Sequence, residues 1–145
     1  MSKSSDPKIL HASCVAVGEK GVLITGASGS GKSSLALQLM ALGARLVSDD
    51  RTVIQAQDDR LIASAPPIIA GMIEARGIGL VHAAPKGPTP LALAVDLDKV
   101  ESERLPPARY QSFEAIALPC LHKVENPAWP AAILQYLKAG RVAPK

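Results

Sequence analysis

Hydrophobic residues recur with a period of two in some segments of the chain and near 3.6 in others. The stretch CVAVGEKGVLITG predicts two strands, at residues 14–17 and 22–25, joined by a tight turn. Leucines recur at helical spacing between residues 31 and 42, which predicts a helix that ends at Gly43. The pattern therefore predicts a strand–loop–helix unit near the start of the chain.

The rest of the pattern predicts further strands and one more helix. RLVSDD predicts a strand that runs into two acids, and TVIQAQ and RLIASA predict a hairpin that turns at Asp58 and Asp59. Pro66 and Pro67 begin an irregular or helical piece, and AAPKGPTP predicts a loop because proline lacks a backbone donor. LALAVDLD and FEAIALPCL each predict one strand, with a polar segment between them. NPAWPAAILQYLKAG predicts a closing helix with Pro127 or Pro130 near its first turn and Gly140 after its end.

Strands outnumber helices in this pattern, so we expect an α/β fold with a mixed β-sheet core, one early helix and a C-terminal helix. The 145 residues leave room for a single domain, 1–145. Aromatic residues make up only 3% of the chain, so the core must consist mainly of Ala, Val, Leu and Ile. Residues 1–8 are expected to lie outside the ordered fold.

Composition and charge exclude several classes of protein. A hydrophobic content of 48% excludes a disordered chain, and a net charge of +3 without a run of Lys or Arg does not fit a nucleic-acid binder. No apolar run reaches the roughly 18 residues of a membrane helix, and the polar N-terminus is not a signal peptide. We therefore expect a cytoplasmic protein in which Cys14 and Cys120 are buried and reduced.

The stretch GASGSGKS, residues 26–33, carries the clearest chemistry. It fits the pattern G-x-x-x-x-G-K-S between an apolar strand and a helix. Glycines let backbone N–H groups point at phosphate oxygens, Lys32 can bridge the β- and γ-phosphates, and Ser33 can bind Mg²⁺. We predict a P-loop in the mixed sheet core that binds a nucleoside triphosphate or another polyphosphate through Gly26, Ala27, Ser28, Gly29, Ser30, Gly31, Lys32, Ser33 and Ser34.

Acidic residues after two predicted strands are candidates for the phosphate chemistry. Asp49 and Asp50 are expected to alternate in direction along a strand, so that one faces a metal ion and the other takes the proton of an acceptor. An ordinary turn is the alternative for this pair. Asp96 is a second candidate, with an exposed strand end as its alternative. Glu74 and Arg76 beside glycines suit a Mg²⁺ and phosphoryl site, although a surface Glu-x-Arg is ordinary.

Four segments together resemble the bacterial HPr kinase/phosphorylase family in its catalytic C-terminal domain. LHASCVAVGEKGVLITGASGSGKS is similar to the family's histidine-containing strand and P-loop, and LVSDD to its pair of acids. EARGIGLV resembles the Glu-x-Arg-Gly-Ile-Gly signature, and ERLPP resembles the Asp-Arg-Leu stretch. The resemblance covers residues 10–105 well. Since the family's separate N-terminal domain is missing, it implies a short, single-domain form.

The resemblance implies a kinase that uses ATP and Mg²⁺ to phosphorylate a serine of the phosphocarrier protein HPr. Either Asp49 or Asp50 would take the serine proton, with Asp50 slightly favoured. His11 would tune the site electrostatically. Ser33 and Glu74 would bind Mg²⁺. The transferring phosphoryl group would be stabilised by Lys32, Arg76 and Arg104. The resemblance also implies a homo-oligomer, hexameric or smaller. From the charge and the apolar runs we expect no nucleic-acid or membrane partner.

The chain departs from the family pattern in several places. Ala27 and Ser34 stand where the family often has Asp and Glu, and AAPKGPTP is shorter than the family's segment there. LPCLHKVENPAW has Lys123 and Asn126 but lacks the Gly-Arg stretch that supports phosphorolysis of phosphoserine. Kinase activity is therefore the expected direction, and the reverse reaction is left open.

Two other functions are compatible with the P-loop. A small-molecule kinase or NTPase would turn over ATP without a protein acceptor, and a non-catalytic nucleotide sensor would bind it to regulate a partner. The chain has no N-K-x-D and no LSGGQ-like signature, which excludes switch GTPases and ABC-type ATPases.

Overall fold

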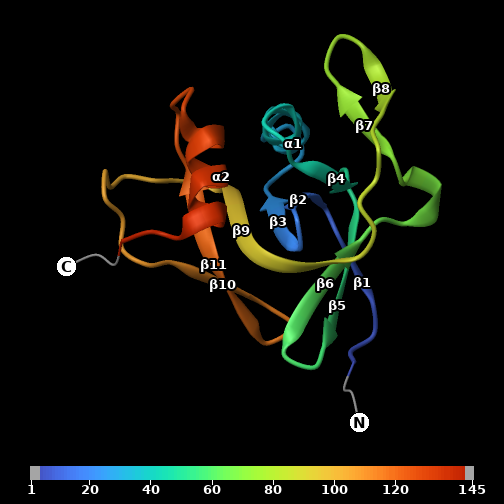
Figure 1. The fold of residues 1–145 in the computed structure, drawn as a ribbon, viewed down its shortest axis with the longest axis horizontal. Helices are drawn as coiled ribbons and strands as arrows, with labels where there is room; N and C mark the ends of the chain where they lie inside the picture. Colours follow the sequence, from blue (N-terminus) through green and yellow to red (C-terminus); the bar gives the residue numbers. More distant parts are fainter. Residues whose placement is uncertain (1–3, 143–145) are drawn as a thin grey trace.

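The computed structural model describes residues 4–142 and has a mixed α/β architecture (Figure 1). Nine strands within these residues form one curled sheet, two strands form a separate hairpin, and two α-helices pack on the sheet. The strands are β1 (Lys8–Leu10), β2 (Ala12–Val17), β3 (Lys20–Thr25), β4 (Arg45–Ser48), β5 (Thr52–Gln57), β6 (Arg60–Ser64), β7 (Met72–Ala75), β8 (Gly79–His82), β9 (Thr89–Val100), β10 (Tyr110–Phe113) and β11 (Ile116–Lys123). The helices are α1 (Lys32–Ala41) and α2 (Trp129–Ala139), and a 3₁₀ turn spans Pro67–Ile69.

Strand β9 connects the parts of the sheet because it pairs with three neighbours. Its first residues pair antiparallel with β6, and its later residues pair parallel with β3 on one side and β11 on the other. The order along the sheet is β1-β5-β6-β9-β3-β2-β4, and β10 extends it beyond β11. Asp96 of β9 lies in register with Thr25 of β3 and His122 of β11. The carboxyl ends of three parallel strands therefore meet at one edge, which is where ligands of open α/β sheets bind.

Two apolar cores lie on opposite faces of this sheet. Along β3, Val22 and Ile24 are buried in the core that includes both helices, whereas Leu23 belongs to the other core. In the first core, Leu39 of α1 and Ile133 of α2 are almost fully buried. Strands close the second core, because β5–β6 and β10–β11 curl beneath the central strands (Figure 1). The helices and these hairpins thus leave the edge after β3, β9 and β11 available for a site.

The main predictions of the fold are confirmed. The chain is an α/β protein with a mixed sheet, a helix directly after residue 31 and a C-terminal helix. β2 and β3 form the predicted hairpin, and β5 and β6 form the next one. Pro130 lies in the first turn of α2, and Gly140 follows its last residue, as expected.

Three parts of the chain differ from the predictions. FEAIALPCL was expected as one strand but forms the hairpin β10–β11, which turns at Glu114 and Ala115 with φ angles of 49° and 62°. The piece after Pro67, expected to be irregular or helical, contains β7 as well as the 3₁₀ turn. Lys8 begins β1, and the Ser5 N–H donates to the Ala56 carbonyl at 2.8 Å, so residues 4–8 belong to the sheet edge. Residues 1–3 of the predicted tail lie outside the described residues.

Both cysteines are buried and outside any disulfide, as predicted. Burial raises the pKa of the Cys14 thiol to about 12 and also raises the pKa of the Cys120 thiol. Neither thiol is therefore poised for thiolate chemistry. Within residues 4–142, neither helix is long and apolar enough to cross a membrane.

Candidate active site

The loop of residues 26–33 runs from the end of β3 into α1. Gly26, Gly29 and Gly31 have φ angles of 151°, 83° and 103°, which side chains strongly disfavour. A Cβ atom on Gly26 would lie 2.5 Å from the Ser30 hydroxyl oxygen, so this position requires glycine. Gly31 is the last residue before α1. The unpaired N–H groups of the first helical turn therefore follow the loop directly.

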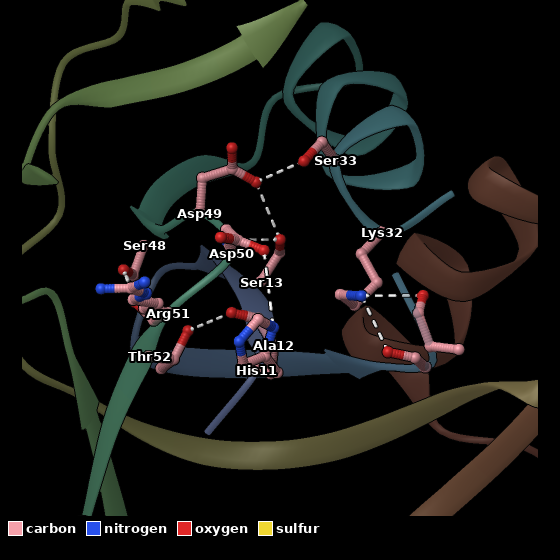
Figure 2. Close-up of polar contacts among 12 residues, drawn as sticks. His11, Ala12, Ser13, Lys32, Ser33, Ser48, Asp49, Asp50, Arg51 and Thr52 are labelled. Carbon is pink, nitrogen blue, oxygen red and sulfur yellow. Dashed lines mark hydrogen bonds and ion pairs between the residues drawn. The ribbon is translucent and has the colours of Figure 1, made fainter. Parts of the chain in front are cut away.

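Lys32 places a positive charge inside this loop. The residue is only 6% exposed, and its ammonium group donates to the carbonyls of Gly26 at 2.8 Å and Ala27 at 3.0 Å (Figure 2). The hydroxyl oxygen of Ser30 is buried and has no hydrogen-bond partner within residues 4–142. A cation, a helix N-terminus and an unpartnered hydroxyl around one glycine loop fit the oxygens of a phosphate chain.

Asp96 and Asp98, two acids near the end of β9, lie close to the loop of residues 26–33. Asp98 Oδ1 accepts the N–H of Ala27 at 2.9 Å, and Asp96 Oδ1 accepts the N–H of Asp98 at 2.9 Å. The first bond holds the carboxylate of Asp98 against the loop, and the second holds the backbone of Asp98. A metal role for Asp96 stays a prediction.

Asp49 connects three segments of the site and is only 7% exposed. Its Oδ1 accepts the hydroxyls of Ser33 at 2.6 Å and Ser13 at 2.8 Å (Figure 2). Its Oδ2 accepts the N–H of Glu74 at 3.0 Å. These bonds hold α1, β2 and β7 around one carboxylate. The Ser33 hydroxyl and the Asp49 carboxylate are oxygen donors of the type that Mg²⁺ prefers. Residues 4–142 contain no group of three or more His, Cys, Asp or Glu side chains that could hold a metal ion.

The side chain of Asp50 points away from that of Asp49. Its side chain is 61% exposed and lies 3.8 Å from His11, measured from Oδ1 to Nδ1 (Figure 2). Both acids follow the end of β4 at Ser48, and Asp50 has a φ of 66°. The expected divergence of the two carboxylates therefore occurs. Its cause is a left-handed residue in a bend, which Asp tolerates, rather than alternation along a strand.

Two clefts meet at Asp50. The P-loop cleft has a volume of about 260 Å³ and is lined by Ser28, Gly29, Gly31, Lys32, Ser33, Ser34, Asp50, Glu74 and Arg76. The second, which we call the Ile69 cleft, has a volume of about 210 Å³ and is lined by Asp49, Asp50, Arg51, Ile69, Met72, Glu74 and Leu80. Asp50 and Glu74 line both clefts, so they form the boundary between a polar cleft and a more apolar one.

The structure does not bring Arg104 to this site. Arg104 lines a different cleft, of about 570 Å³, between α2 and residues 101–106. In the same region, the guanidinium of Arg109 donates two hydrogen bonds to the carboxylate of Glu101, at 2.9 and 2.8 Å. These bonds lower the pKa of Glu101 to about 2. Of the two arginines implied by the resemblance, only Arg76 therefore lines the P-loop cleft.

Sequence reasoning missed Ser13. This fully buried residue donates to Asp49, and its oxygen accepts the N–H of Asp50 at 3.1 Å. Ser13 thereby fixes both acids relative to β2. The available signal was a polar residue inside the apolar run ASCVAV, because a buried hydroxyl needs a partner.

The fold and site together define a mixed α/β protein in which a glycine loop lies between a central parallel strand and a helix, with two acids beside it. The family model for the HPr serine kinase C-terminal domain matches residues 2–86, which include the loop, both acids, Glu74 and Arg76. The chain belongs to this family.

Curated relatives share the same part of the chain. An HPr kinase/phosphorylase of Clostridium botulinum strain Eklund 17B is 50% identical over 72 residues, which are 50% of this chain and 24% of the relative. One of Lacticaseibacillus casei strain BL23 is 41% identical over 81 residues, which are 55% and 25% of the two chains. The chain thus spans about a quarter of the length of these relatives. The solved Hpr(Ser) kinase/phosphatase from Coxiella burnetii superposes with a TM-score of 0.77 at 27% identity, over 90% of this chain and 88% of that one.

Proposed function

We propose that this chain is a kinase that uses ATP and Mg²⁺ to phosphorylate a serine of the phosphocarrier protein HPr. The observation that carries the proposal is the position of Asp50 between the P-loop cleft and the Ile69 cleft. A phosphoryl donor in the first and a hydroxyl in the second would meet at one carboxylate. The names of the relatives supply the choice of HPr as the acceptor.

The donor side carries the groups that a nucleoside triphosphate requires. Lys32 would exchange its two carbonyl partners for phosphate oxygens, and Arg76, which lines the same cleft, would contact the transferring group. Ser33 and Asp49 would hold Mg²⁺, with Glu74 in reach of the same cleft. When bound, Mg²⁺ supplies charge neutralisation at the β- and γ-phosphates.

Asp50 is the group we assign to the serine proton. Asp49 accepts three hydrogen bonds, whereas within residues 4–142 the carboxylate of Asp50 has one such side-chain contact, 3.8 Å from Nδ1 of His11. Asp50 would accept the proton as the seryl oxygen bonds to the γ-phosphorus. The bond from this phosphorus to the β,γ-bridging oxygen breaks, and its electron pair leaves with ADP. His11 would stabilise the negative form of Asp50 beforehand.

We also propose a homo-oligomer. Ile68, Ile78 and Leu80 are 87%, 79% and 72% exposed around the β7–β8 hairpin, a concentration of apolar surface that favours a protein contact. Light scattering should give a mass above 15.1 kDa, and a monomer at every concentration would contradict this part of the proposal.

The direct test is mass spectrometry of HPr after incubation with the chain, ATP and Mg²⁺. One phosphate on a serine of HPr is expected. ATP hydrolysis without labelled HPr would instead favour a small-molecule kinase or NTPase, and ATP binding without turnover would favour a nucleotide sensor. Either result would overturn the proposal.

A further inference from the structure

A third cleft adjoins the P-loop on the side away from Asp50. It has a volume of about 410 Å³ and lies between α1 and the segment that joins β11 to α2. Gly31 and Ser34 line both this cleft and the P-loop cleft, so the two are continuous across the start of α1. We call it the α1–α2 cleft. It sits at the carboxyl ends of β9 and β11, the edge where the sheet favours ligands.

The start of α1 would give a phosphate chain bound at the loop a direction. Ser33 donates to Asp49, on the side of the P-loop cleft where the γ-phosphoryl end belongs. Ser34 and Gln38, one helical turn apart, both line the α1–α2 cleft. Because the γ-phosphoryl end must reach Asp50, the opposite end of the nucleotide leaves the loop past Ser34. That exit leads into the α1–α2 cleft.

The walls of this cleft suit a nucleoside. Leu97 of β9 and the half-buried ring of Trp129 provide apolar and aromatic surface. Gln38 contributes an exposed amide, and Asn126 contributes an amide nitrogen, because its Oδ1 already accepts the N–H of Ala128 at 2.8 Å. Lys123 and Glu125 also line the cleft, and they pair with each other at 3.1 Å. Apolar and aromatic surface beside converging polar groups is typical of small-molecule sites.

We propose that the α1–α2 cleft holds the base and ribose of the nucleotide, with Trp129 against the base and Gln38 as a hydrogen-bonding partner. The assignment rests on the proposed nucleotide binding at the P-loop. Leu97 and the residues of the β11–α2 segment lie beyond residue 86, where the family match ends, so this chain's own C-terminal part would select the nucleoside.

The single tryptophan of the chain makes the test direct. ATP and inorganic tripolyphosphate, each with Mg²⁺, are titrated while Trp129 fluorescence is followed, and both affinities are measured by calorimetry. Both ligands should bind, but ATP should change the fluorescence far more than tripolyphosphate. Gln38→Ala and Trp129→Leu should weaken ATP at least about fivefold and leave tripolyphosphate unchanged, since base stacking and amide contacts involve only the nucleoside.

Gln135→Ala is the matched control, because Gln135 is exposed on α2 and does not line the cleft. Equal losses for ATP and tripolyphosphate, or no loss of ATP affinity in Gln38→Ala and Trp129→Leu, would overturn the inference. It would also be overturned if neither ligand bound the wild-type chain. If the fluorescence and affinity results hold but HPr receives no phosphate, only the proposed acceptor fails.

Discussion

The hydroxyl oxygen of Ser33 lies 2.6 Å from Oδ1 of Asp49, although one residue is in the first turn of α1 and the other follows β4. This contact links the P-loop to the paired acids without a ligand. Both oxygens belong to the site that we propose for Mg²⁺. The same carboxylate accepts two further bonds, so it supports the fold as well as the site.

Asp49→Asn should therefore lower stability. The amide replaces one acceptor oxygen with a donor that faces other donors, and unfavourable buried pairs of this kind cost about 1–3 kcal/mol. Urea unfolding of the variant should show this loss, together with weaker binding of Mg²⁺-ATP. Asp59→Asn, in the exposed β5–β6 turn, should change the free energy of unfolding by less than about 0.5 kcal/mol. Equal effects of the two substitutions would contradict the role given to Asp49.

Gly26→Ala should damage the loop. The new methyl group would lie 2.5 Å from Ser30 Oγ and 3.1 Å from Leu97 Cβ, at a φ of 151°. We expect a lower melting temperature and at least about a tenfold loss of ATP affinity, equivalent to about 1.4 kcal/mol. Gly87→Ala is the control, because a Cβ there meets nothing within 4 Å and its φ is not positive. An unchanged ATP affinity in Gly26→Ala would mean that the loop tolerates a side chain.

Substitutions of Arg76 and Arg104 should have different effects on the rate of phosphoryl transfer. Arg76 lines the P-loop cleft, so Arg76→Gln should slow phosphoryl transfer at least about tenfold by removing a charge beside the transferring group. Arg104 lines the cleft beside α2, so Arg104→Gln should leave the single-turnover rate within about twofold of wild type. If Arg104→Gln slowed phosphoryl transfer as much as Arg76→Gln, Arg104 would have to act at the same site as Arg76.

Paired acids were predictable from the sequence, but the reason for their divergence was not. The apolar strand followed by Asp49 and Asp50 can be recognised from neighbouring residues alone. The direction of each carboxylate depends on the left-handed φ of Asp50 and on Ser13, which is 36 residues from Asp49 in the chain. A contact between residues so far apart in the chain cannot be predicted from the periodicity of the sequence.

The hairpin β10–β11 shows a second limit. Its turn uses Glu114 and Ala115 at positive φ, where glycine or asparagine is the usual signal, so FEAIALPCL predicts one continuous strand. Tertiary pairing of β11 with β9 overrides this local preference. Arg104 lies in a polar segment without periodicity. The sequence pattern therefore could not predict that Arg104 lies away from the P-loop.

The ion pair of Glu101 and Arg109 predicts a pH dependence. The pKa of Glu101 in the folded protein is about 2, below the ordinary 4.5. The contribution of the ion pair to the free energy of unfolding is therefore fully present above pH 4.5 and is lost as the pH falls toward 2. The difference in unfolding free energy between wild type and Arg109→Met should therefore be constant above pH 5 and shrink between pH 4.5 and 2. Urea unfolding across this range measures it. Glu19→Gln removes an ion pair with Lys86 in which the Glu19 side chain is 72% exposed, so it should show a much smaller difference. A difference that grows on acidification would contradict the assignment.

The central claim is that donor and acceptor meet at the carboxylate of Asp50. Single-turnover transfer from ATP to HPr, compared between wild type, Asp50→Asn and the control Asp59→Asn, tests it most directly. Because the Asp50 side chain is 61% exposed, Asp50→Asn should fold and bind ATP normally but transfer at least about 100-fold more slowly. Transfer at the wild-type rate by Asp50→Asn, with ATP binding intact, would contradict the claim.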